Sequence, residues 1–162
     1  MKTKVYLILQ ILLISLIFLS IGHAFYQSSL PPEESAEESG KVGEIIEEII
    51  PPDTKPGEYV QKNLRKIAHF TEFLFLGLWT SLYVVFFLRN KYTLSLIFPF
   101  GMTIAMLDET VQIFSNRGPS VTDVWIDVFG YSVALAAVLG SFYGAVLVTR
   151  IVRARREGRI GR

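Results

Sequence analysis

Residues 73–88 read FLFLGLWTSLYVVFFL, a run of sixteen positions without a formally charged side chain. A helix needs about 20 predominantly apolar residues to cross a bilayer. With its flanks the run extends to residues 67–88, which is long enough. Three further apolar segments cover residues 5–24, 92–114 and 124–148. Because backbone polar groups in hydrocarbon must bond within their own segment, we expect four transmembrane helices.

The composition supports this assignment. Hydrophobic residues make up 51% of the 162-residue chain and charged residues 19%, which argues against a disordered chain and against an ordinary soluble domain. A soluble helical bundle is further disfavoured because the four segments mostly lack polar stripes. The chain has no cysteine, which excludes disulfides, thiolate metal sites and cysteine nucleophiles. The fold class we predict is an all-α integral membrane protein.

The chain divides into four parts. They are an N-terminal transmembrane anchor at 1–26, an acidic Pro-rich linker at 27–61, a three-helix transmembrane core at 62–149 and a basic tail at 150–162. The first part could instead be a signal peptide with a cleavage site at 22–24. Its apolar run exceeds the usual core of about 7–15 residues, which favours an uncleaved anchor.

The linker differs in composition from the rest of the chain. Residues 31–60 hold nine acidic residues and five prolines but only two lysines. Such a segment is expected to be mostly disordered. Within it, residues 43–50 could form a short amphipathic helix that rests on the membrane surface or binds a partner.

Basic residues predict the orientation. Ten of them mark one side of the membrane, namely Lys2, Lys4, Arg89, Lys91, Arg150, Arg153, Arg155, Arg156, Arg159 and Arg162. Because short loops rich in Lys and Arg stay in the cytoplasm, both termini are predicted to be cytoplasmic, with the linker and the 115–123 turn outside. Anionic lipid suffices as the partner of the basic tail, and no nucleic acid is expected.

Five acidic residues lie outside the linker and the tail, in or beside the membrane segments: Glu72, Asp108, Glu109, Asp123 and Asp127. A charge at the centre of a membrane helix costs about 2.5–3.5 kcal/mol on insertion scales. The uncharged runs that border Glu72 and Asp108 each span about 24 Å of helix, against a hydrocarbon core of ~30 Å. These acids are therefore expected near the outer edge of the hydrocarbon, where all five share one depth.

Helical spacing places these side chains on common faces. His69 and Glu72 are three residues apart, Asp108 and Gln112 four, and Asp123 and Asp127 four. We expect one outward-facing polar cluster whose candidate ligand-binding residues are Lys66, His69, Glu72, Asp108, Glu109, Gln112, Arg117, Ser120, Asp123 and Asp127. Ser120 and Asp123 also resemble a capping box at the start of a helix. A stripe of small residues (Gly130, Ala134, Ala137, Ser141 and Gly144) and the pair Gly140 and Gly144 predict close helix packing.

Three motifs carry a resemblance to a known family. They are KIAHF at 66–70, DETVQIF at 108–114 and RGPSVTDVWIDVFG at 117–130. This pattern resembles the VanZ-like family, which is named after a protein associated with teicoplanin resistance, and covers about residues 60–148. The first helix and the linker are outside it. The resemblance implies a multi-pass protein of the bacterial plasma membrane linked to the cell envelope, without an established reaction.

The first hypothesis is a binding protein. Its polar cluster would take an amphiphile such as a lipid-linked envelope precursor or a lipoglycopeptide, with a contribution to glycopeptide resistance. The alternative is an intramembrane enzyme with His69, Glu72, Asp108 and Glu109 as catalytic candidates for acid–base chemistry.

Other readings stay open. His69, Glu72, Asp108 and Asp127 could hold a divalent cation, but no dense metal motif is present and no metal or cofactor is assigned. A transporter and a purely structural network are further possibilities. The oligomeric state is left open.

Overall fold

The computed structural model describes residues 2–88 and 90–160, and all regular structure within them is helical. The helices are α1 (Lys2–Ser29), α2 (Pro32–Glu47), α3 (Lys55–Lys62), α4 (Leu64–Phe87), α5 (Lys91–Phe114) and α6 (Val121–Ile160). The all-α prediction is confirmed for this part of the chain. Arg89 and Arg162, and the side chains of Lys2, Lys91 and Arg159, lie outside the described residues.

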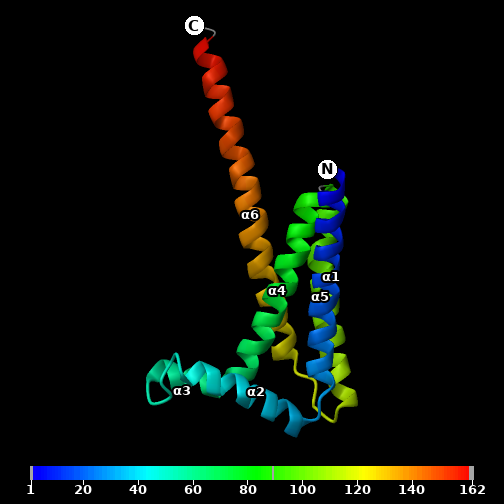
Figure 1. Ribbon diagram of the computed structural model, residues 1–162, viewed down its shortest axis with the longest axis vertical. Coiled ribbons are helices and arrows are strands. Elements are labelled where there is room, and N and C mark those ends of the chain that lie inside the picture. Colours follow the sequence, from blue (N-terminus) through cyan, green and yellow to red (C-terminus); the bar gives the residue numbers. More distant parts are fainter. Residues whose placement is uncertain (1, 89, 161–162) are drawn as a thin grey trace.

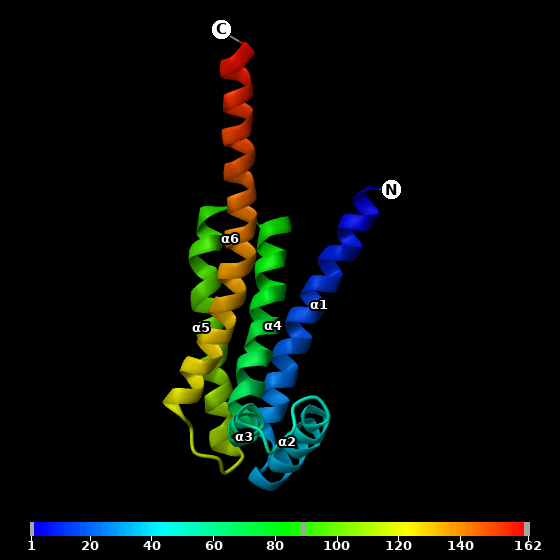
Figure 2. The same cartoon turned by 90° about the vertical axis from the view of Figure 1, so that its left-hand side faces the viewer.

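Four of the helices are long and apolar enough to cross a membrane, as predicted. The candidate spans are Thr3–Ser29, Leu64–Phe87, Tyr92–Phe114 and Val121–Arg156. Helix α4 packs against α1, α5 and α6. Figure 2 shows α1 leaning away from α4 toward its N-terminus.

The two chain ends lie at one end of the bundle, and α2 and α3 lie at the other (Figure 1). Helix α2 runs across that end instead of along the bundle. The 115–120 turn lies at the same end as α2. This arrangement agrees with an even number of crossings, whereas the side that faces the cytoplasm stays a prediction from the basic residues.

The acidic segment was predicted to be mostly disordered, and this prediction was wrong: it folds into α2 and α3. Pro32 stands at the first helical position of α2, where its missing N–H costs nothing, and Glu33 and Glu34 face the positive end of the helix dipole. In α3, the Thr54 side chain caps the helix by accepting from Gly57 N–H. Favourable residues at the two helix N-termini, including one side-chain cap at Thr54, thus support helices in a segment whose average composition indicates disorder.

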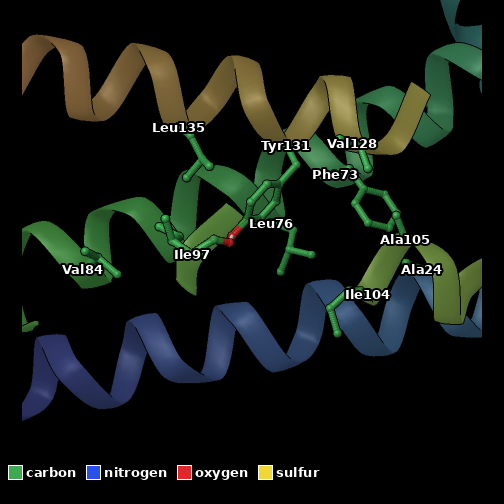
Figure 3. Close-up of a cluster of buried hydrophobic side chains, with 10 residues drawn as sticks. All are labelled: Ala24, Phe73, Leu76, Val84, Ile97, Ile104, Ala105, Val128, Tyr131 and Leu135. Carbon is green, nitrogen blue, oxygen red and sulfur yellow. Dashed lines mark hydrogen bonds between the residues drawn. The ribbon is translucent and has the colours of Figure 1, made fainter. Parts of the chain in front are cut away.

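The apolar core lies between α4, α5 and α6, and α1 adds Ala24 to it (Figure 3). Tyr131 is fully buried and reaches from α6 toward α5, where its hydroxyl donates to Ile97 O at 2.9 Å. The Thr80 hydroxyl of α4 lies 3.1 Å from the Tyr131 hydroxyl oxygen. The Tyr131 ring fills the space beside Gly101, so a Cβ at Gly101 would overlap this ring. Tyr131 therefore joins three membrane helices at one point.

The small-residue stripe of α6 is used only in its first half. Gly130 and Ala134 are buried, and a Cβ at Gly130 would overlap the carbonyl oxygen of Phe70 in α4. A Cβ at Gly140 or Gly144 would have no neighbour within 4 Å among the described residues. The close-packing prediction for that pair is therefore wrong within one chain, because α6 continues past the end of α4 (Figure 1).

Candidate functional site

The predicted polar residues gather at the α2 end of the bundle. The side chains of His69, Asp108, Glu109, Gln112 and Asp127 are buried, with Gln112 and Asp127 fully enclosed. They come from α4, α5 and α6, as their spacing predicted. Burial of five polar groups in a membrane bundle is costly unless each finds a partner, so their contacts decide what the cluster can do.

One half of the cluster is a closed hydrogen-bond network. Gln112 Nε2 donates to Glu109 Oε1 at 2.5 Å, and Arg65 donates to Gln112 Oε1 at 2.6 Å. The backbone N–H of Ser120 donates to Glu109 Oε2 at 2.6 Å. Both Glu109 oxygens are therefore satisfied, and the carboxylate ties the end of α5 to the start of α6.

The start of α6 shows how the predicted capping box is altered. Ser120 Oγ accepts from Asp123 N–H at 3.2 Å, which is the expected cap. In a capping box the third residue would return a bond to the Ser120 N–H, but Glu109 takes that place from another helix. The Asp123 carboxylate instead lies 4.0 Å from Arg65 Nη2.

The other half of the cluster is open. His69 Nδ1 lies 3.2 Å from Asp127 Oδ1 and 3.9 Å from Asp108 Oδ2. Ser28 Oγ donates to Asp108 Oδ2 at 2.7 Å. The other buried atoms, namely His69 Nδ1, Asp108 Oδ1 and both Asp127 carboxylate oxygens, make no hydrogen bond within the described chain.

The end of α1 contributes residues that the sequence reasoning missed. Besides the Ser28 hydroxyl, the Gln27 carbonyl accepts from Arg117 at 3.2 Å, and the Ser28 carbonyl accepts from Ser115 Oγ at 2.9 Å. The predicted apolar segment ended at residue 24, although α1 continues to Ser29. The run of polar residues QSS at 27–29 is the signal that could have pointed to them.

Two predicted residues lie apart from the buried cluster. Glu72 is half-buried, and its Oε1 lies 3.3 Å from Nε2 of His23 on α1. Lys66 is exposed, and its side chain forms no hydrogen bond or ion pair with the described residues. Arg65, one position earlier, contacts the cluster instead, through Gln112 and Asp123.

Three adjoining hollows surround the cluster. An apolar groove of about 440 Å³ lies between α1 and α4 and includes Leu16, Phe75 and Trp79. A polar cavity of about 310 Å³ lies between α1, α2 and α4 and includes His69 and Arg117. The two share His23, Ala68 and Glu72. A basic hollow of about 630 Å³ beneath α2 is lined by Lys62, Arg65 and Arg117.

Arg117 sits at the junction of the polar cavity and the basic hollow. It is buried, and this burial, followed by the charge of Arg65, lowers the pKa of the Arg117 guanidinium from its ordinary value. Glu109, Asp108 and Asp123 act in the opposite direction but do not cancel the effect. An anion placed between the two guanidiniums would relieve their mutual repulsion.

Within the part of the chain that the structure describes, two sets of side chains could hold a metal ion. They are His69, Glu109 and Asp123, and His69, Asp108 and Asp127, with the ligand atoms of each set within 4.8 Å of one another. Both sets combine one imidazole with two carboxylates, a mixed donor set that Zn²⁺ accepts.

Comparison with known proteins gives one match. The family model described as VanZ/LLP1 matches residues 6–144. No curated protein and no solved structure matches the chain. The match is longer than the 60–148 region expected from the motifs, since it includes α1, α2 and α3, whose placement outside the resemblance was wrong.

Proposed function

The chain belongs to the VanZ/LLP1 family and is a multi-pass membrane protein, and from this premise we propose that it binds an amphiphile with an anionic headgroup at the α2 end of the bundle. The hydrophobic chain would occupy the apolar groove between α1 and α4. The headgroup would occupy the polar cavity and the basic hollow. A lipid-linked envelope precursor or a lipoglycopeptide has this chemistry.

One observation carries the proposal: the apolar groove and the polar cavity share His23, Ala68 and Glu72. Ligand sites combine an apolar lining with a few placed polar groups. Here the two linings are separated along the bundle, so a ligand with an apolar tail and a polar head would meet each in turn. The groove lies between the membrane helices α1 and α4, so a lipid could enter it from the side, out of the bilayer.

Charge supports an anionic headgroup. Lys62, Arg65 and Arg117 line the basic hollow, and Arg65 and Arg117 also line the polar cavity. Guanidinium groups bind phosphate and carboxylate through paired donors. If the α2 end faces outward, as the basic residues predict, the site lies at the depth of the outer-leaflet headgroups. Sequestering or altering exposure of an envelope precursor there would link the protein to glycopeptide resistance.

The test uses the full chain in nanodiscs with an anionic polyprenyl phosphate, and measures binding by native mass spectrometry. Arg117→Ala is expected to weaken binding about tenfold or more, because a charge-assisted contact to phosphate is lost. Lys66→Ala is the matched control, since it removes an exposed cation that lines neither the groove nor the cavity. Equal binding by both variants would refute the headgroup site.

A second pair of variants tests the path between groove and cavity. Ala68→Trp would fill the junction without changing charge, whereas Ala136→Trp places the same bulk on an exposed face of α6. We expect only Ala68→Trp to lower binding. In a host made less susceptible to teicoplanin by this protein, the same variant should restore susceptibility at unchanged membrane abundance.

An intramembrane enzyme is the second candidate, favoured by one contact. His69 lines the polar cavity, and its Nδ1 lies 3.2 Å from Asp127 Oδ1. A small adjustment from this separation would form a hydrogen bond through which Asp127 could orient His69 as a general base. Glu109, an expected catalytic residue, is instead held by Gln112 and Ser120. Incubation with the polyprenyl phosphate or its diphosphate tests for turnover, and an unaltered lipid would remove this candidate.

A further inference from the structure

The open half of the polar cluster presents ligand atoms without hydrogen-bond partners. His69 Nδ1, Asp108 Oδ1 and both carboxylate oxygens of Asp127 are buried, and none makes a hydrogen bond within the described chain. The residues are 7%, 1% and 0% exposed, respectively. An unpaired polar atom buried in a protein costs about 1–3 kcal/mol, and a charged one costs more. Three such side chains at one point indicate a missing common partner.

We propose that His69, Asp108 and Asp127 form a binding site for one Zn²⁺-type divalent cation, contributed by α4, α5 and α6. The donors supply one imidazole nitrogen and two carboxylates, which are ordinary zinc ligands. A divalent cation would neutralise two carboxylates, so the site as a whole would carry no net charge within the bundle. This inference is independent of the amphiphile proposal, because it concerns the ion alone.

The spacing fits such an ion. Bonds of about 2.0–2.2 Å at tetrahedral angles place ligand atoms about 3.4 Å apart. His69 Nδ1 lies 3.2 Å from Asp127 Oδ1 and 3.9 Å from Asp108 Oδ2. The distance between His69 Nδ1 and Asp127 Oδ1 is that of an ion pair, but the two atoms do not form a hydrogen bond. The ligand atoms of all three residues lie within 4.8 Å of one another, so their side chains would have to draw closer around a bound ion.

The alternative set of His69, Glu109 and Asp123 fits less well. Both Glu109 oxygens already accept hydrogen bonds, from Gln112 and from the Ser120 N–H. A metal there would have to break the contact that joins α5 to α6. The chosen set loses nothing of this kind. Its one existing hydrogen bond runs from Ser28 Oγ to Asp108 Oδ2; it would orient the Asp108 carboxylate and leaves Oδ1, which has no hydrogen bond, for the ion.

An ion can reach this site. His69 and Ser28 both line the polar cavity, which also includes Glu38 of α2. On its His69 side the site therefore borders the cavity in which we place the amphiphile headgroup. A phosphate oxygen or a water molecule would complete a tetrahedral zinc centre there.

The experiment titrates Zn²⁺ alone into the purified full-length chain, free of oligohistidine tags, by calorimetry in detergent. We expect one ion per chain. Asp108→Asn and Asp127→Asn should each weaken binding about tenfold or more, since each replaces a charged carboxylate ligand by a neutral amide of nearly the same shape. Asp123→Asn removes a carboxylate of the rival set, and His23→Ala removes the only other histidine; both should bind as the parent chain does.

A second readout guards against variants that fail to fold. Zn²⁺ should raise the thermal unfolding midpoint of the parent chain by more than that of Asp127→Asn at the same Zn²⁺ concentration, because an ion stabilises the native state according to its affinity for that state. The proposal is overturned if the parent chain binds no more Zn²⁺ than the Asp108→Asn, Asp127→Asn double variant. It is also overturned if Asp123→Asn weakens binding as much as Asp127→Asn.

Discussion

Replacing Gly130 by alanine should separate α6 from α4. An added Cβ would overlap the Phe70 carbonyl oxygen and lie 3.3 Å from the Leu74 backbone nitrogen. Both atoms belong to the backbone of a membrane helix, so neither can turn aside as a side chain would. The helices must move apart at the level of His69 and Asp127, which flank this contact on α4 and α6.

The magnitude follows from two opposing terms. Overpacking of a tight contact costs about 1–3 kcal/mol, and collision with backbone belongs at the upper end. Alanine gains about 1 kcal/mol over glycine in a helix. Gly130→Ala should therefore lower the free energy of unfolding by about 2 kcal/mol. Gly140→Ala, with no neighbour within 4 Å of its added Cβ, should raise it by up to about 1 kcal/mol.

The two variants form a matched pair, with the same substitution on the same helix. SDS titration in mixed micelles, followed by tryptophan fluorescence, measures both free energies of unfolding. We expect a gap of about 3 kcal/mol between the variants, the sum of the two estimates. Equal stability would show that α4 and α6 do not approach each other at Gly130, and would remove the packing that holds His69 beside Asp127.

Three further predictions use the same purified chain or intact cells. Tyr131→Phe should cost about 1 kcal/mol in the SDS titration, because its hydroxyl loses partners on α4 and α5; unchanged stability would contradict its joining role. Ser120→Ala should cost about 1 kcal/mol as a lost cap, with Ser120→Thr as the conservative control that retains the hydroxyl. Asp53→Cys should react with an impermeant maleimide on intact cells and Arg153→Cys only after permeabilisation, because residue 53 is predicted to be outside and the C-terminal tail inside. The native chain has no cysteine, so each variant reports on one position, and the reverse pattern would invert the topology.

The four crossings were predictable because membrane burial leaves a strong pattern: long runs without charge must be helices in lipid. The folding of residues 32–62 into α2 and α3 was not predicted, because it depends on single positions, Pro32 at the start of α2 and the Thr54 cap of α3, that the average composition of the segment conceals. The failed packing prediction at Gly140 has a related cause. Sequence shows that a residue is small, but not whether a neighbouring helix extends that far.

At the site, spacing predicted the residues better than their partners. His69, Asp108 and Asp127 meet because helical periodicity turns them inward. The contact of Glu109 with the Ser120 N–H joins two helices and depends on the 115–120 turn, so no periodicity indicates it. The contact of Ser28 with Asp108 could not be predicted either, because it depends on how α1 packs against α5.

The contacts divide the polar cluster into two parts with different roles. Glu109, Gln112 and Arg65 satisfy one another, and such a network stabilises a bundle without need of a ligand. Asp108, Asp127 and His69 lack that closure. A purely structural cluster would have no reason to leave its most deeply buried carboxylate, Asp127, without a hydrogen bond. Loss of stability should therefore follow substitutions of Glu109 and Gln112, whereas loss of Zn²⁺ binding should follow those of Asp108, Asp127 and His69.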